Sequence, residues 1–262
     1  MTKPKIRLSL YLSEVKMRSI FRNETSSLFT RAEKVEDFLN VLFVINIFFM
    51  IIINIFNSDI INIALIVINI LYVSISVIID VLLKNIAEDE QRKSMISDAF
   101  NINITSYDSE DYYTNNAKPS IKRMGVNTFE STLYTNMLLS KIMIEKIIKV
   151  VIEIILYVII IVKENNIGLA VTLTSLLFSS EIAQDLLKTI YYKIKVKQIY
   201  DELYGIFVTH GYSKKFEPKI ILYVINYECV KSYCHINLPN KLFLKNRDLI
   251  GDKWNEINSN IK

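Results

Sequence analysis

The stretch FLNVLFVINIFFMIIINIF, residues 38–56, decides the fold. It carries no charged side chain, and its polar residues are Asn40, Asn46 and Asn54. A helix rises about 1.5 Å per residue, so a stretch of this length extends roughly 28 Å, the thickness of the hydrocarbon core of a bilayer. The sequence therefore predicts a transmembrane helix here.

Three further apolar segments follow, and short polar turns divide the four segments into two pairs. The second segment ends at Lys84, and the third begins with Lys149 and Glu153, which are spaced to pair on one helix face. The four expected spans are residues 38–56, 60–83, 147–162 and 167–183. Because glycine (5) and proline (4) are scarce, we expect an all-α integral membrane protein whose spans form two hairpins.

Lysine and arginine set the expected orientation, since these residues concentrate on the cytoplasmic side of bacterial inner-membrane proteins. Residues 1–37 and 84–146 hold eight each and residues 186–262 hold thirteen, whereas the two turns hold only Lys163. Both termini are therefore predicted to be cytoplasmic. The expected organisation is an amphipathic cytoplasmic helix (1–37), a first transmembrane hairpin (38–83), a cytoplasmic segment (84–146), a second hairpin (147–183) and a cytoplasmic helical stalk with C-terminal helices (184–262).

The segments outside the spans also have helical patterns. Asn127 and Glu130 fit the capping-box spacing for a helix that continues through the third span. Pro218 suits the first turn of a helix over about 218–235, and a last short helix is expected at 249–257. Residues 101–119 are polar and aperiodic, which predicts a loop.

The fourth span is expected to continue as a stalk, because no helix breaker follows it before Gly205. Apolar residues recur along this stalk at alternating spacings of four and three, as in a short coiled coil. They are Tyr192, Val196, Ile199, Leu203 and Ile206. This pattern suggests either a contact between chains in a homo-oligomer or packing on the chain's own helices at 12–37 or 218–235.

Polar residues form two stripes along the expected spans. The first consists of Asn62, Asn69, Ser76 and Asp80, and the second of Thr172, Ser175 and Ser179. Polar groups are costly in a bilayer, so such stripes either line a pore or join helices by hydrogen bonds. In the pore interpretation, a ring of Asp80 carboxylates at the inner mouth attracts cations.

Other kinds of site have little support in the sequence. It has no glycine-rich phosphate loop, no nucleophile elbow and no Cys/His ligand set, so we expect no enzyme activity, cofactor or metal. The acidic runs at 88–90 and 108–111 are interpreted as solvated surface. A net charge of +4 is too small to indicate nucleic-acid binding. Cys229 and Cys234 are expected to stay reduced in the cytoplasm.

Several short motifs precede and follow the second hairpin. They are Asp98-Ala99-Phe100, Tyr112-Tyr113-x-Asn115-Asn116, Gly125-Val126-Asn127-x-Phe129-Glu130-Ser131, Asn237-Leu238-Pro239-x-Lys241 and Trp254. In motif and layout the chain resembles the SMODS-associated four-transmembrane effectors of bacterial anti-phage defence. The resemblance implies a pore-forming role triggered by a nucleotide, and it supplies no catalytic residues.

The leading functional hypothesis is therefore an oligomeric effector that permeabilises the bacterial inner membrane when a cytoplasmic signal acts. Its expected partners are the lipid bilayer, further copies of itself, and a nucleotide second messenger or signalling protein. The alternative is a membrane-anchored sensor or scaffold whose cytoplasmic helices bind a protein. A transporter or intramembrane enzyme is disfavoured, because the hairpins show no internal repeat, no broken helix and no acid–base pair.

Overall fold

The computed structural model describes the backbone of residues 4–53, 56, 58–104, 117–163 and 169–261. Side chains are described over the same ranges except for residues 4–27, 53, 156–157, 159–163 and 169–179. Every regular element in these ranges is helical, which confirms the all-α prediction.

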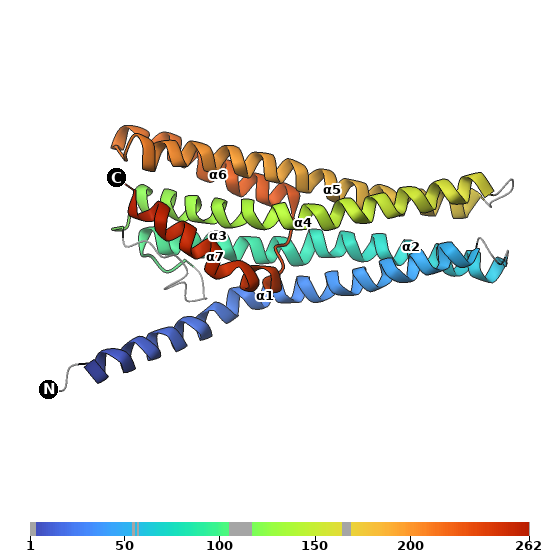
Figure 1. Cartoon of the computed structure of the whole chain (residues 1–262), viewed down its shortest axis with the longest axis horizontal. Helices are drawn as coiled ribbons and strands as arrows, with labels where there is room; N and C mark the ends of the chain where they lie inside the picture. The colour runs from blue at the N-terminus through green and yellow to red at the C-terminus, as the bar shows by residue number, and fades with distance from the viewer. Residues whose placement is uncertain (1–3, 54–55, 57, 105–116, 164–168, 262) are drawn as a thin grey trace.

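Three helices are unusually long: α1 (Pro4–Ile53), α4 (Ile121–Lys163) and α5 (Leu169–Tyr204). The remaining elements are α2 (Asp59–Ile78), a π-helical turn (Ile79–Lys84), α3 (Asn85–Phe100), a second π-helical turn (Gly205–Thr209), a 3-10 turn (Lys214–Phe216), α6 (Glu217–Cys234) and α7 (Asn240–Ser259). Figure 1 shows α1, α2, α4 and α5 side by side at one end of the molecule and α3, α6 and α7 gathered at the other. We call these ends the arm and the head; the head also includes residues 121–141 of α4, residues 189–204 of α5 and the second π-helical turn.

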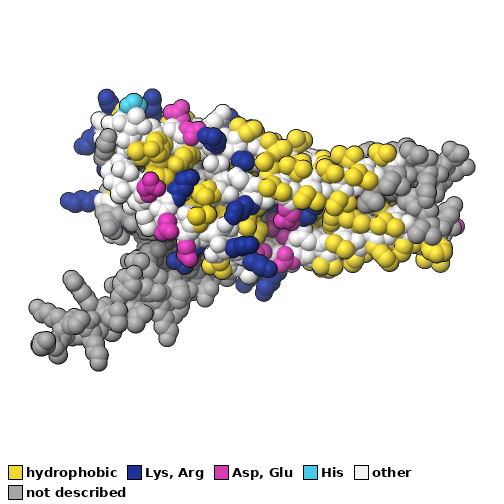
Figure 2. Space-filling view, viewed as in Figure 1, with side chains coloured by type: hydrophobic (Ala, Val, Ile, Leu, Met, Phe, Trp, Pro, Cys, Tyr) yellow, Lys and Arg dark blue, Asp and Glu magenta, His cyan; other side chains and the backbone are white. Residues whose placement is uncertain are grey.

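The arm has an apolar surface. Side chains such as Val44, Phe48 and Ile63 are each about 60% exposed, and Figure 2 shows apolar atoms covering this part of the molecule. Among the described residues, Leu28–Ile52 and Asp59–Phe100 are long and apolar enough to cross a membrane. An exposed apolar surface of this extent is typical of a protein that contacts lipid or another apolar partner.

The other two expected spans, 147–162 and 167–183, fall in α4 and α5. The described residues there do not yield further helices that meet the same criterion, and many side chains of these spans lie outside the described part of the chain. The number of spans therefore remains a prediction.

The helix that contains the second expected span continues past Lys84, the residue at which the apolar segment ends. It passes through the π-helical turn and continues as α3 to Phe100, where Asn101 ends it in the left-handed conformation. Lys84 is 8% exposed, and its ammonium group lies 2.8 Å from both Glu36 on α1 and Asp80. A buried lysine with two carboxylate partners does not need to end a helix.

The predicted boundaries of the other helices are partly correct. A single helix does connect residues 12–37 to the first apolar segment, α5 does continue to Tyr204, and Pro218 does lie in the first turn of α6. The capping-box prediction is wrong, because α4 begins six residues before Asn127. Ser120 caps it instead, accepting a hydrogen bond from the backbone N–H of Arg123 at 3.2 Å. The last helix, α7, is longer than expected at both ends.

The head is built around an aromatic core. The Phe129 ring is fully buried and packs edge-on against Trp254 at 5.4 Å between ring centroids. Tyr200 and Phe207 of the α5 region lie against the same ring at 5.2 and 6.1 Å. Gly125, one turn before Phe129, allows α4 to approach its neighbours closely, since a Cβ there would lie 2.5 Å from the Ile220 side chain.

The apolar seam of the stalk lies inside this core. Tyr192, Val196, Ile199, Leu203 and Ile206 are all at most 4% exposed and pack with residues of α4 and α6. In the single chain the seam therefore faces this chain's own helices, including the one at 217–234, as the intramolecular alternative expects. A contact between chains through the stalk stays a prediction.

Candidate functional site

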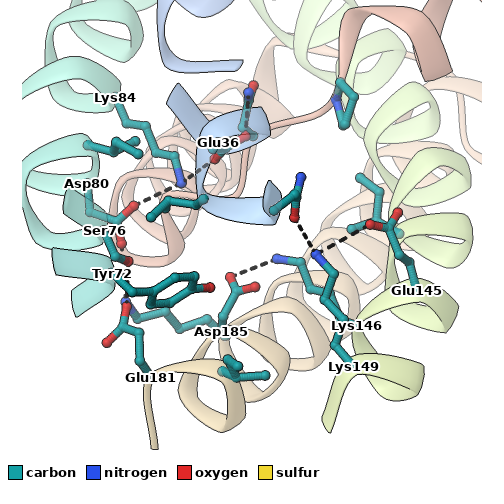
Figure 3. A pocket seen from close by; sticks show the side chains of 18 residues that line it. Glu36, Tyr72, Ser76, Asp80, Lys84, Glu145, Lys146, Lys149, Glu181 and Asp185 are labelled. Carbon is teal, nitrogen blue, oxygen red and sulfur yellow. Dashed lines mark hydrogen bonds and ion pairs between the residues drawn. The ribbon is translucent and has the colours of Figure 1, made fainter. Parts of the chain in front are cut away.

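A cavity of about 150 Å³ lies where the arm meets the head. Side chains from α1, α2 and its π-helical turn, α4 and α5 surround it, and the link between α6 and α7 contributes Asn237 and Pro239. Figure 3 shows its charged groups pointing toward one another from these helices. The cavity brings nine charged side chains of the described residues together.

Carboxylates and lysines alternate around this cavity, with one more carboxylate than lysine. They are Glu36, Asp80, Glu145, Glu181 and Asp185, and Lys84, Lys146, Lys149 and Lys188. Tyr72, Ser76 and Asn40 add polar groups between them.

One ionic network crosses the cavity from α1 to α5. Glu36 and Asp80 share the Lys84 ammonium group at 2.8 Å each, and the second oxygen of Asp80 lies 3.7 Å from Lys188. Asn237 donates a hydrogen bond of 3.0 Å to the other oxygen of Glu36. The network thus joins α1, the π-helical turn, α5 and the link between α6 and α7 (Figure 3).

A second set of ion pairs connects α4 to its neighbours. Lys146 lies 2.7 Å from Asp185 on α5, so this ion pair connects α4 to α5. Lys149 donates to Asn40 of α1 at 2.7 Å and lies 3.5 Å from Glu145. The partner expected for Lys149 was Glu153; the structure pairs the lysine with the carboxylate one turn earlier.

Polar contacts continue from the cavity into the arm. Ser76 donates a 2.8 Å hydrogen bond to Glu181, which joins α2 to α5. Further along, Asn46 of α1 donates to Asn69 of α2, and both amides are essentially inaccessible to solvent. The carbonyl oxygen of Asn46 and the amide nitrogen of Asn69 have no hydrogen-bond partner. Such polar contacts between apolar helices are a known means of fixing helix pairs in a bilayer.

The structure brings part of the first predicted stripe together. Ser76 and Asp80 line the cavity, Asn69 lies in the α1–α2 contact, and Asn62 is half-buried near the start of α2. In the single chain, therefore, Asn69, Ser76 and Asp80 contact other side chains of the protein rather than an open path. Thr172, Ser175 and Ser179 of the second stripe lie outside the residues whose side chains are described.

Several cavity residues were not predicted from the sequence. Glu36 was not singled out, Lys84 was placed only at the end of the second span, and Lys146 was counted only for the orientation of the chain. What these residues share in the sequence is their position. Each is a charged residue next to an apolar segment, where the helices of a bundle could surround it. Sequence alone does not distinguish this placement from ordinary solvent exposure.

The cavity has no arrangement suited to covalent chemistry. Its carboxylates contact lysines or hydroxyl groups, and no cysteine or histidine lines it. Within the described residues, there is no group of three or more His, Cys, Asp or Glu side chains placed to hold a metal ion. What the arrangement can do is exchange ion pairs, admit water and small ions, or change its width as the helices shift.

The motifs on which the family resemblance was based have structural partners in the head. Asp98 accepts two hydrogen bonds from the Arg123 guanidinium, at 2.6 and 3.1 Å, and one from Asn127 at 2.6 Å. Ser120 donates its backbone N–H to Ala99 at 3.0 Å. These contacts close the base of the loop between α3 and α4; Tyr112, Tyr113, Asn115 and Asn116 lie outside the described residues.

Cys234 and Tyr212 are among the titratable groups of the head with a perturbed pKa. Burial raises the pKa of the Cys234 thiol to about 11, so it stays protonated at neutral pH. Tyr212 donates a 2.6 Å hydrogen bond to Glu217, which raises the pKa of its phenol to about 12. Both effects stabilise the neutral form, and neither group lies in the cavity.

Comparison of the chain with protein-family models, with curated proteins and with solved structures found no match.

Proposed function

We propose that this protein is a four-span protein of the bacterial inner membrane that permeabilises the membrane, as a homo-oligomer, in response to a cytoplasmic signal. The observation that carries the proposal is the charged cavity between helices whose outer surface, in the arm, is apolar. Charged side chains within a bundle of lipid-facing helices are rare because they are costly, and they commonly mark paths for ions.

The cavity supports a permeation role by its position as well as its charge. It lies at the head end of the arm, and polar contacts continue from it past Ser76 and Glu181 toward Asn46 and Asn69. Four helices are too few to enclose a wide aqueous channel, so conduction requires several copies. The excess of carboxylates over lysines around the cavity favours weak preference for cations.

Opening such a path has a definable cost. The Asn46–Asn69 contact and the Ser76–Glu181 contact must be exchanged for contacts with water or with another chain. Hydrogen bonds between membrane helices contribute about 0.6 kcal/mol on average and up to about 1.7 kcal/mol, so a few of them can be exchanged at moderate cost. The same polar groups therefore suit both a closed packed state and a hydrated open one.

The head is the part that receives the signal in this proposal. It contains the motifs that resemble the anti-phage effectors, and it contacts the cavity through Asn237 and Pro239. A nucleotide second messenger or a signalling protein is the expected trigger. The alternative function, a membrane-anchored sensor or scaffold, is favoured by the fact that Asn69, Ser76 and Asp80 already have partners within the single chain.

An experiment on membrane permeability separates the two functions. The full chain is expressed at high level from an inducible promoter, so that the small open fraction present without the signal is enough to be detected, and a potential-sensitive dye reports depolarisation. We expect depolarisation by wild type and its loss in Asn69→Leu with Ser76→Leu. Each change makes α2 more apolar, so membrane insertion is retained, as membrane fractionation would verify. Absence of depolarisation by wild type, together with absence of ion flux from vesicles containing the purified chain, would support the scaffold.

Reporter fusions test the topology independently. Fusions at Asn165 and between Ser58 and Asp59 are expected to be periplasmic, and fusions after Lys84 and at Lys262 cytoplasmic. A periplasmic signal from the fusion at Lys262 would overturn the four-span arrangement.

A further inference from the structure

Glu36 connects the head to the arm through a single side chain. One of its oxygens lies 2.8 Å from the Lys84 ammonium group at the cavity, and the other accepts a 3.0 Å hydrogen bond from Asn237. Asn237 is in the five-residue link between α6 and α7, and Pro239 of the same link also lines the cavity. Part of the cavity wall is therefore supplied by the head.

The link is held firmly at both ends. His235 ends α6 in the left-handed conformation, with its ring 3.3 Å from Glu88 of α3, and the adjacent Ile236 is buried in the head core. Pro239 directly precedes the first turn of α7. Because few residues lie between these fixed points, a shift of α6 or α7 must move Asn237.

The carboxylate that Asn237 contacts is part of a shared ionic network. Lys84 divides its charge between Glu36 and Asp80, and Asp80 also lies near Lys188 of α5. Lys84 extends from the π-helical turn, a kind of helical segment that is frequent at functional sites. Loss of the Asn237 hydrogen bond leaves Glu36 with Lys84 and water, which alters the wall between α1 and the head.

We propose that the Asn237–Glu36–Lys84 contact is an autoinhibitory latch by which the head limits access to the inner wall of the cavity, whose rim at Glu145 and Asp185 is exposed. A signal that shifts α6 and α7 withdraws Asn237, the link moves away from α1, and the cavity opens further toward the cytoplasm. The latch regulates the cavity on which the proposed permeation rests, but its state can be measured without any ion flux.

The test measures access to the cavity in the full chain. Ser76→Cys places a thiol on the cavity wall, in a background where Cys229→Ser and Cys234→Ala remove the native thiols. In membranes, a charged water-soluble maleimide should label Cys at position 76 slowly. Adding Asn237→Asp replaces the donated hydrogen bond by repulsion between two carboxylates, and we expect labelling at least about tenfold faster, as for a lost charge-assisted hydrogen bond.

Two further variants make the result specific. Asn226→Asp introduces the same chemical change at an exposed site on α6 and should leave the labelling rate unchanged. Glu36→Gln combined with Asn237→Asp reverses donor and acceptor, so it should restore slow labelling. Equal labelling of wild type and Asn237→Asp, or equal acceleration by Asn226→Asp, would overturn the latch.

Ion flux distinguishes failure of the latch from failure of the proposed function. With Ser76 retained, vesicles of phosphatidylethanolamine and phosphatidylglycerol containing Asn237→Asp should lose potassium at least about tenfold faster than those containing wild type. Faster labelling without faster flux would support the latch and contradict permeation. Faster flux without a change in labelling would contradict the latch and support permeation.

Discussion

The arm and the head reverse each other's arrangement of polar and apolar residues. In the head, Phe129, Trp254 and Leu203 form a buried apolar core, as in a protein surrounded by water. In the arm, large apolar side chains face outward while Asn46 and Asn69 pair in the contact between helices. This contrast is what the proposed function requires of a chain that meets both lipid and water, and the charged cavity lies where the two parts join.

The largest expected effect is a loss of stability when a charge replaces a buried residue of the seam, compared with the same change at an exposed site on the same helix. Leu203→Asp places a carboxylate in the head core, where Leu203 is fully buried, and should cost more than about 4 kcal/mol of unfolding free energy. Ile194→Asp on the same helix, at a site 52% exposed, should cost no more than about 0.5 kcal/mol. The buried Trp254, the one tryptophan in the sequence, reports unfolding by fluorescence in detergent.

A different outcome would favour the alternative in which the seam forms a contact between chains. If Leu203→Asp keeps the Trp254 emission and the unfolding midpoint of wild type but lowers the mass found by light scattering, the stalk mediates contact between chains.

A smaller effect is expected at the closest helix approach in the head. Gly125→Ala adds a Cβ that would lie 2.5 Å from Ile220 and 2.8 Å from Phe207, so one of these side chains must shift. We expect a loss of about 1–3 kcal/mol, as for other overpacked cores. The matched control is Gly205→Ala, where nothing lies within 4 Å of the added atom. Denaturant titration checks both, and equal stability of the two variants would contradict the close packing.

In the arm, the free energy that couples Asn46 and Asn69 should be smaller than the stability losses expected in the head. Asn69→Leu leaves Asn46 without its partner, whereas Asn46→Leu with Asn69→Leu removes both polar groups from the contact. We expect a coupling free energy of about 0.6–1.7 kcal/mol, the range measured for hydrogen bonds between membrane helices. Detergent unfolding followed by circular dichroism of the four proteins in the cycle gives this value. Strictly additive effects would show that the contact does not stabilise the arm.

The mildest test changes no residue and compares the reactivity of the two native thiols of the head. At pH 8 a maleimide should modify the exposed Cys229, whereas Cys234 is buried with a pKa of about 11 and is almost entirely protonated. Because the thiolate is the reactive form, Cys234 should become reactive only near pH 11 or after unfolding. Mass spectrometry of the labelled chain checks this, and equal labelling at pH 8 would show that the end of α6 opens readily.

The sequence was informative where composition and periodicity determine structure. The uncharged run 38–56 predicted a long apolar helix, and the structure places residues 38–53 in α1. The stalk spacing predicted a buried seam but not its partner, since a helix packs similarly against its own chain or another. Asn127 was assigned to a helix cap because its partner Asp98, 29 residues away, is not visible in local spacing.

The site was harder to predict for the same reason. The polar stripe expected over residues 62–80 includes Ser76 and Asp80, which line the cavity; that they line a pore stays a prediction. Glu36, Lys146 and Asn237 come from other helices and a link, and their contribution depends on how those elements pack. A charged residue next to an apolar segment usually lies in solvent, so the tertiary arrangement is needed to recognise an enclosed one.

The π-helical turn at Ile79–Lys84 has a consequence for the insertion and deletion of residues. A π turn closes its hydrogen bonds over one residue more than an α turn, so it absorbs one residue without rotating the helix beyond it. Removing one residue from this turn should leave both α2 and α3 facing as they do now. Removing one residue in the middle of α2 should instead rotate everything on one side of the deletion by about 100°. The continuous helix can therefore lose one residue at the cavity. The contact of Asn69 with Asn46 on one side of the turn and that of Asp98 with Arg123 on the other should both be retained.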